Sequence, residues 1–234
     1  MAAVSPVSEP CRRLLADVLA AGAPYRLALA GDHALHAHGL TGLPGRDRDL
    51  EFATEHAEDM TRIVAVLRAG LWGRGRQAGV GETGALSARL IVTEPDSGEE
   101  YEVGVAKEVL WRPPVPTGHG LALSLEDAVG IKVRALAGRG LVGDLIGVRA
   151  AADRWSLPEL EELGRRHAPD GFDLGDLRMR LTGTDWIDDT DFAVHGLDPA
   201  AIDELRRWAQ RWADEIGEQL CEAGAPEEEA PEED

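Results

Sequence analysis

The fold is decided by one stretch of the chain: Leu27-Ala-Leu-Ala30, then Gly31-Asp-His-Ala34, then His38-Gly39, then Arg48-Asp-Leu-Glu-Phe52. This order indicates an apolar strand, a glycine turn that opens a short helix, and a second strand. Alternate residues of a strand point to the same face. Asp49 and Glu51 can therefore hold one divalent cation between them, while Leu50 and Phe52 face the core. Mg²⁺ is typically held by one or two carboxylates together with phosphate oxygens of the substrate.

The glycine turn strengthens this interpretation. The first backbone N–H groups of a helix have no partner within the helix, and such groups suit phosphate oxygens. Gly31 and Asp32 stand at that position. The stretch therefore predicts that a polyphosphate and a divalent cation lie side by side.

A lysine further along the chain has two possible placements. Lys132 interrupts the apolar helical run Val129-Gly-Ile-Lys-Val133. If the side chain points into a cleft it can bind phosphates, and if it points outward it is an ordinary surface lysine.

Taken together, these motifs resemble a known family. Gly31-x-x-Ala34, His38-Gly39, Arg48-Asp-Leu-Glu51, Lys132-Val-Arg-Ala-Leu136, Arg139-Gly140 and Asp144 are similar to the nucleotidyltransferase AbiEii/AbiGii toxin family. The resemblance covers about Ala21 to Arg154. Members have the nucleotidyltransferase fold, and some are toxins of toxin–antitoxin systems. The resemblance implies a nucleoside triphosphate as partner, with Mg²⁺, and transfer of a nucleoside monophosphate to an acceptor hydroxyl.

The resemblance also implies roles for individual residues. Expected catalytic residues are Asp49, Glu51, Lys132 and Asp144, and expected metal ligands are Asp49 and Glu51. Expected nucleotide-binding residues are Gly31, Asp32, Arg48 and Lys132.

Four positions depart from the family pattern. Asp32 stands in place of a second glycine, Glu51 in place of aspartate, Gly104 in place of a third carboxylate, and Gly147 in place of an aspartate. Glu102 and Asp47 are possible substitutes for the missing carboxylate, or they are solvated strand residues. Two functions therefore stay open: a nucleotidyltransferase, and a catalytically degenerate binding or regulatory module.

Composition limits the possible partners. The chain has 234 residues, 44% of them hydrophobic, and a net charge of −19; its last eight residues carry six acids and no base. We expect strong nucleic-acid binding to be absent, because phosphate contacts need clustered Lys and Arg. The segment from Arg68 to Arg76, with Trp72, is either a small nucleotide clamp or a loop and strand of the sheet.

Targeting signals are not evident. Residues 1–10 have neither a basic nor an apolar run, and no segment has the ~20 apolar residues that span a bilayer. Cys11 and Cys221 have no metal-ligand spacing. We expect a cytoplasmic protein with no membrane contact.

Patterning predicts an α+β fold: a nucleotidyltransferase-like mixed sheet with helices, followed by a C-terminal helical bundle. The expected domains are 1–116 and 117–222, with a disordered acidic tail at 223–234.

Ser8, Ser124 and Ser156 are expected to cap helices. Trp208 and Trp212 are expected in the core, and His33, His36 and His38 are expected to be structural rather than metal ligands. Strands are expected at 26–30, 47–53, 86–93 and 100–107, and helices at 32–38, 55–68, 142–154 and 198–222 among others.

Overall fold

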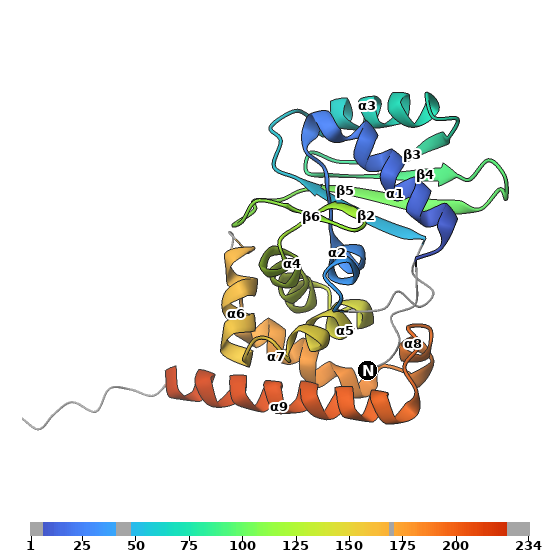
Figure 1. The fold of residues 1–234 in the computed structure, drawn as a ribbon. Helices are drawn as coiled ribbons and strands as arrows, with labels where there is room; N and C mark the ends of the chain where they lie inside the picture. The colour runs from blue at the N-terminus through green and yellow to red at the C-terminus, as the bar shows by residue number, and fades with distance from the viewer. Residues whose placement is uncertain (1–6, 41–47, 169–170, 224–234) are drawn as a thin grey trace, which may run out of the picture.

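A seven-stranded mixed sheet and a group of helices make up the molecule, as the computed structural model shows for residues 7–40, 48–168 and 171–223 (Figure 1). The strands are β1 (Ala28–Leu29), β2 (Asp49–Thr54), β3 (Gln77–Thr83), β4 (Ser87–Thr93), β5 (Glu100–Lys107), β6 (Val115–Thr117) and β7 (Gly120–Ala122). The helices are α1 (Glu9–Ala21), α2 (Gly31–Ala37), α3 (Met60–Trp72), α4 (Leu125–Gly138), α5 (Val142–Ala151), α6 (Leu157–Arg166), α7 (Leu174–Thr182), α8 (Asp189–Ala193) and α9 (Pro199–Ala223). The predicted α+β class is confirmed.

Strand β2 lies at the centre of the sheet, whose order is β3-β4-β5-β2-β1-β7-β6. It runs antiparallel to β1 and parallel to β5. Glu51 is paired in register with Gly104 of β5, and Gly104 is paired with Arg89 of β4. These three residues therefore form one row across three adjacent strands.

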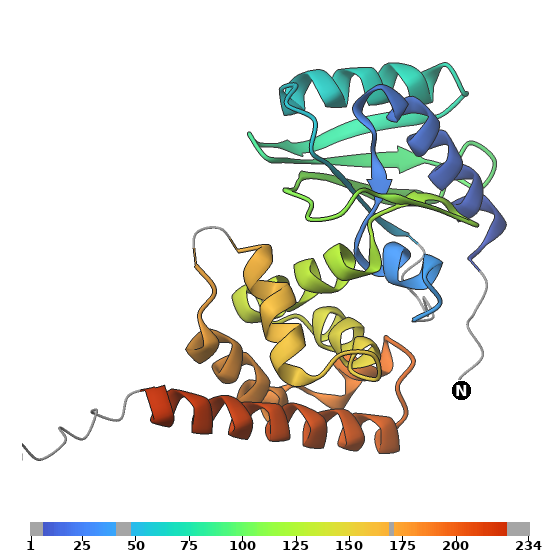
Figure 2. The ribbon, with the colours of Figure 1, turned by 60° about the vertical axis from the view of Figure 1, so that its left-hand side comes forward.

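The two faces of the sheet are covered by different helices. Helices α1 and α3 lie on one face, and α2, α4 and the C-terminal helices lie on the other, as both ribbon views show (Figures 1 and 2). Leu50 and Phe52 are buried in the core under α1 and α3. The intervening Asp49 and Glu51 are exposed on the opposite face. The alternation predicted for this strand is confirmed.

Serine residues begin three of the helices, as predicted. Ser8 accepts a hydrogen bond from the backbone N–H of Cys11, and Ser124 accepts one from that of Asp127. Ser156 and Glu159 form a reciprocal capping box at the start of α6. Each cap satisfies N–H groups that a helix leaves unpaired at its start.

The other C-terminal helices pack against an apolar stripe of α9. Trp208 and Trp212, one helical turn apart, are buried with ring centroids 5.3 Å apart. The indole N–H of Trp212 donates to Glu161 Oε1 over 2.9 Å, which satisfies both polar groups inside the core. Both tryptophans are core residues, as predicted.

Several element boundaries differ from the prediction. Helix α3 begins at Met60 rather than Glu55, because the side chains of Thr54 and His56 accept backbone N–H groups and hold a turn there. The segment after α3 belongs to the sheet: Arg76 is buried between Asp17 and Glu94 and leads into β3.

The sheet also extends past residue 116. Strands β6 and β7 form a hairpin, and β7 pairs with β1 through Ala122 and Leu29. The division into domains at this point stays a prediction. Apart from Ala223, which ends α9, the predicted disordered tail lies outside the described residues. Within the described ranges, no helix combines the length and the apolar character that crossing a membrane requires.

Candidate functional site

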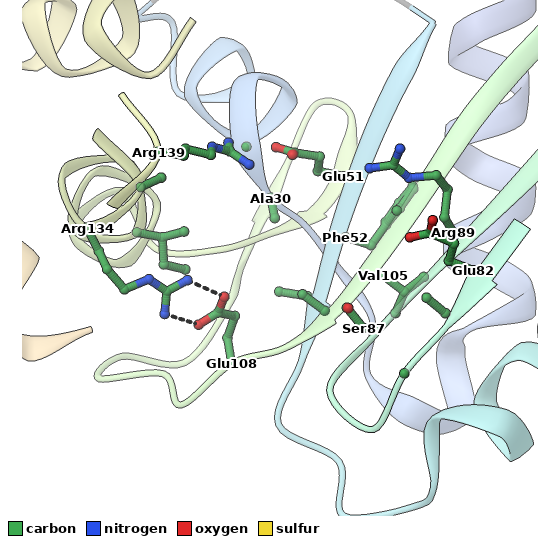
Figure 3. A pocket seen from close by; sticks show the side chains of 18 of the residues that line it. Ala30, Glu51, Phe52, Glu82, Ser87, Arg89, Val105, Glu108, Arg134 and Arg139 are labelled. Carbon is green, nitrogen blue, oxygen red and sulfur yellow. Dashed lines mark hydrogen bonds and ion pairs between the residues drawn. The ribbon is translucent and has the colours of Figure 1, made fainter. Parts of the chain in front are cut away.

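A cavity of about 510 Å³ opens between the sheet and helix α4 (Figure 3). Its walls come from Ala30 and the start of α2, strands β2, β4 and β5, the end of β3 with the β3–β4 turn, and α4. This volume lies within the range of small-molecule sites. The charged residues that line it are Glu51, Glu82, Glu108, Arg89, Lys132, Arg134 and Arg139. The cavity thus carries four cations against three carboxylates, in a chain of net charge −19.

The side chain of Glu51 lies directly over the glycine turn. A Cβ built on Gly31 would meet the carboxylate of Glu51, and Gly31 has a φ of +54°. The positive φ favours glycine at this position. In Figure 3 the Glu51 carboxylate lies between the guanidinium groups of Arg139 and Arg89. The predicted neighbours Gly31 and Glu51 are thus in contact.

Lys132 points inward, toward two acids. Its Nζ lies 2.8 Å from Asp32 Oδ1 and 3.1 Å from Asp144 Oδ1, and the residue is buried. Burial lowers the pKa of the ammonium, but Asp32, Asp144 and Glu51 outweigh it and hold that pKa above its usual value. Of the two placements open from the sequence, the structure shows the inward one.

Asp144 links Lys132 to Arg139. Arg139 donates from Nε to Asp144 Oδ2 over 2.7 Å and from Nη2 to Oδ1 over 2.9 Å. Burial raises the pKa of the Asp144 carboxyl, and the bonds from Arg139 and Lys132 reverse this and lower it below its usual value. Asp144 is thus a fully ionised anchor that fixes two cations beside the cavity. The predicted residues Gly31, Asp32, Glu51, Lys132 and Asp144 lie together.

Two predicted residues lie apart from this cluster. Asp49 shares the face of Glu51 but is not among the residues that line the cavity, and it is paired in register with Glu102. Arg48 forms an ion pair with Glu99 at the start of β5 and does not line the cavity either. Glu102, weighed as a substitute carboxylate, is held by Arg89 instead. Asp47 lies outside the described residues.

Three arginines and two acids of the site, Glu82 and Glu108 among them, were not predicted as site residues. Arg89, Arg139 and the pair of Arg134 with Glu108 all line the cavity. Arg134 donates from both terminal nitrogens to Glu108, over 2.9 and 2.6 Å. Arg139 stands in a motif that resembles the family, so the sequence did point to this residue. Arg89 had no local signal, because only the register of β4 against β5 brings it there.

The arrangement of Asp49 and Glu51 decides what kind of magnesium site they can form. Asp49 and Glu51 offer oxygen ligands from one face of β2, which is the donor type that Mg²⁺ prefers. Within the described ranges no group of three or more His, Cys, Asp or Glu converges on a metal position. The residues therefore fit an ion that arrives with substrate phosphates, and they do not form an all-protein cage.

The histidines of α2 are structural where contacts are defined. His38 Nε2 lies 2.8 Å from the carbonyl oxygen of Leu123, which ties the C-cap of α2 to the residue that follows β7. His33 Nε2 lies 3.7 Å from the sulfur of Cys11. This agrees with the structural role expected for them.

No protein-family model matches the chain, and no curated protein matches it. Three solved structures are similar to it over most of their length. MenT4, a nucleotidyltransferase toxin from Mycobacterium tuberculosis H37Rv, has 17% identity and a TM-score of 0.55, with 93% of this chain and 96% of that chain covered. JHP933 from Helicobacter pylori has 18% identity and a TM-score of 0.51, with 93% and 98% covered.

The third is a Helicobacter pylori protein provisionally classed as a nucleotidyltransferase. It has 17% identity and a TM-score of 0.54, with 94% of this chain and 100% of that chain covered. Similarity at this level of identity concerns the fold. The chain therefore has the fold of these three structures, two of which are named as nucleotidyltransferases.

Proposed function

We propose that the protein binds a nucleoside triphosphate with Mg²⁺ in the cavity, transfers the nucleoside monophosphate to an acceptor oxygen, and releases pyrophosphate. The observation that carries this proposal is the convergence of Lys132, Arg139 and Glu51 at one end of the cavity, in a chain with this fold. Phosphoryl-transfer catalysis consists mainly of positioning and charge stabilisation, which is what such a cluster supplies.

The cations are suited to bind phosphates. Lys132 stays protonated at neutral pH because of its three acidic neighbours. Asp144 holds Arg139 through Nε and Nη2, so Arg139 offers its remaining N–H groups to a phosphate. Both bind phosphate oxygens from the α4 side of the cavity. Glu51 inside the cavity and Asp49 next to it on the same face of β2 would hold the magnesium ion from the sheet side, and the ion would neutralise phosphate charge.

The missing carboxylate favours a second candidate function. Gly104 leaves the row between Glu51 and Arg89 without an acid, so the protein has fewer carboxylates than a full catalytic set implied by the family resemblance. A binding or regulatory module that holds the nucleotide without transfer would have this composition.

Two measurements test the proposal and separate the candidates. Melting temperature is recorded with each of the four NTPs, with and without Mg²⁺; saturation at a hundred times Kd adds about 2.7 kcal/mol to the free energy of unfolding. Transfer is followed as incorporation of α-labelled NTP into tRNA, protein and small acceptors. Binding with incorporation supports the transferase, and binding without it supports the module.

A matched pair of variants controls these measurements. Lys132→Gln removes a charge from the proposed phosphate site, whereas Lys107→Gln removes one from the partly buried end of β5, outside the cavity lining. Loss of NTP binding in Lys132→Gln but not in Lys107→Gln supports the proposed phosphate site. If no NTP shifts the melting temperature of the wild type, the proposal is wrong. Because MenT4 is a toxin, growth after induced expression is a further readout for toxicity.

A further inference from the structure

The row of residues at the centre of the cavity has a gap in the middle. Glu51, Gly104 and Arg89 are side by side on β2, β5 and β4, and all three line the cavity. A Cβ built on Gly104 meets only the carbonyl oxygen of Leu50, at 3.8 Å. Steric crowding therefore does not require glycine here, and its effect is to leave the position beside Glu51 without a side chain.

Arg89 faces this gap from the far side. Its guanidinium is directed toward Glu51, opposite Arg139 (Figure 3). Arg89 Nε lies 2.8 Å from Glu102 Oε1, and in the part of the chain that the structure describes this is its one ion pair. Both terminal nitrogens are therefore available to a ligand in the cavity. The side chain is 56% exposed, so a ligand can reach it.

This arrangement does not suit a hydroxyl acceptor. A hydroxyl keeps its proton at neutral pH and needs a general base as it attacks. Gly104 supplies none, and Glu108 is bound by both terminal nitrogens of Arg134. Glu51 is assigned to the metal, which leaves Glu82, on the exposed edge strand β3, as the one other carboxylate among the residues that line the cavity. The guanidinium of Arg89 stands where a base would be useful, and it cannot accept a proton at neutral pH.

An anionic acceptor is served well by it. A phosphate monoester has a second pKa of about 6, so its oxygen is ionised at pH 7 and needs no base. A guanidinium binds such a group through two parallel hydrogen bonds. Gly104 leaves room for the group between Glu51 and Arg89.

We propose that the acceptor is an oxyanion of the phosphate monoester class, bound by Arg89 over Gly104; this rests on the proposed nucleotidyl transfer. An acceptor phosphate oxygen attacks the α-phosphorus of the NTP, and the bond from that phosphorus to the bridging oxygen breaks. Pyrophosphate leaves with the electron pair. The product contains a new diphosphate linkage, and no proton has to be removed from the acceptor.

The binding of the anion is tested first, without nucleotide. Inorganic phosphate and glycerol 3-phosphate are titrated calorimetrically into the full chain, into Arg89→Gln and into the control Arg211→Gln, which alters an exposed arginine of α9. We expect Arg89→Gln to weaken binding roughly tenfold or more, because a charged hydrogen bond is lost. Arg211→Gln should bind as the wild type does. Absent binding, or equal binding in wild type and Arg89→Gln, overturns the inference.

Transfer is tested next with matched acceptors. With labelled NTP and Mg²⁺, glycerol 3-phosphate should be labelled and glycerol should not. In Arg89→Gln the KM for glycerol 3-phosphate should rise about tenfold while the KM for NTP changes little.

Gly104→Asp, which the open space tolerates, should reverse the choice of acceptor. Labelling of glycerol 3-phosphate should be lost and labelling of glycerol gained, because the new carboxylate adds a base and repels the phosphate. Labelling of glycerol by the wild type would show that Glu51 or Glu82 acts as a base, and would overturn the inference while the proposed function stands. If no NTP binds at all, the proposed function fails and the phosphate titration still decides on Arg89.

Discussion

Lys132 Nζ lies 2.8 Å from Asp32 Oδ1, so the ammonium that we propose for phosphate binding is already paired with the second residue of α2. Asp144 holds the same ammonium from α5. A phosphate that approaches Lys132 therefore competes with a carboxylate of the protein itself. This explains what aspartate in place of glycine does in the turn: it provides an internal counter-ion.

Removal of that competitor should strengthen nucleotide binding. Asp32→Asn keeps the shape of the side chain and removes its charge, and we expect the Kd for NTP-Mg²⁺ to fall roughly tenfold, the effect of one charged hydrogen bond. Isothermal titration measures it, with the exposed Asp203→Asn on α9 as control. An unchanged or weaker affinity in Asp32→Asn would contradict competition at Lys132.

The ion cluster should also matter for stability. Lys132→Met leaves the buried Asp144 and the partly buried Asp32 without their shared cation, and we expect a loss of about 3 kcal/mol in the free energy of unfolding. Urea denaturation measures it. The double variant Lys132→Met/Asp144→Leu should recover part of the loss, since both charges of one pair are then removed. Strictly additive losses would show that the two residues do not interact.

Asp127 is a second buried anchor, outside the cavity. Its carboxylate accepts the backbone N–H groups of Trp111 and Arg112, each over 3.0 Å, and the hydroxyl of Ser124 over 2.7 Å, and it lies 3.0 Å from His167 Nε2. Burial raises the pKa of this carboxyl, and those hydrogen bonds, led by the one from His167, lower it below its usual value.

Loss of this anchor should therefore be costly. We expect Asp127→Ala to lower the free energy of unfolding by about 3 kcal/mol, because several buried donors lose their acceptor. Ser124→Ala, which removes the cap and one of the donors to Asp127, should cost less, about 1 kcal/mol. Chemical denaturation compares the two variants. Similar losses for both would mean that the carboxylate adds little beyond the cap.

His119 should make stability depend on pH. Burial, His36 and Arg12 lower its pKa from the ordinary 6.5. The unfolded chain then binds the proton more tightly, so the contribution of this group is complete above pH 6.5 and is lost as pH falls toward the lowered folded value. Melting temperatures of wild type and His119→Gln are compared from pH 7.5 to 5. The difference in melting temperature between wild type and His119→Gln should narrow or reverse in acid. A difference that widens in acid would show the opposite shift.

Much of the site followed from local patterns. Strand alternation placed Glu51 and Asp49 on one face, because the period of a strand is two, and serine caps placed the starts of α1, α4 and α6. The inward direction of Lys132 stayed open, because a helix with apolar residues on several sides does not show which side faces the core. The structure resolves it through Asp32 and Asp144, which approach from two other helices.

Other features depend on pairing between distant segments. Arg89 joins the cavity only through the register of β4 against β5, and a shift of one residue would turn it to the other face. Strand β3 has glycine at 79 and 81 and is almost fully exposed, so no hydrophobic alternation indicated it. Strands β6 and β7 have three residues each and contain Pro116 and Gly120, which gave no strand signal either.

The position of β1 has a consequence for the order in which the chain folds. β1 has only two residues, yet it joins β2 to β7, and its partner Ala122 lies more than ninety residues later in the sequence. The backbone N–H of Leu123 also donates to the carbonyl oxygen of Leu29. Contacts this distant in sequence slow folding, because a long loop must close before they form. During synthesis on the ribosome, β1 can therefore be paired on both sides, with β2 and with β7, only after residue 123 has emerged, and a chain interrupted before that point would expose the edge of β1 to other chains.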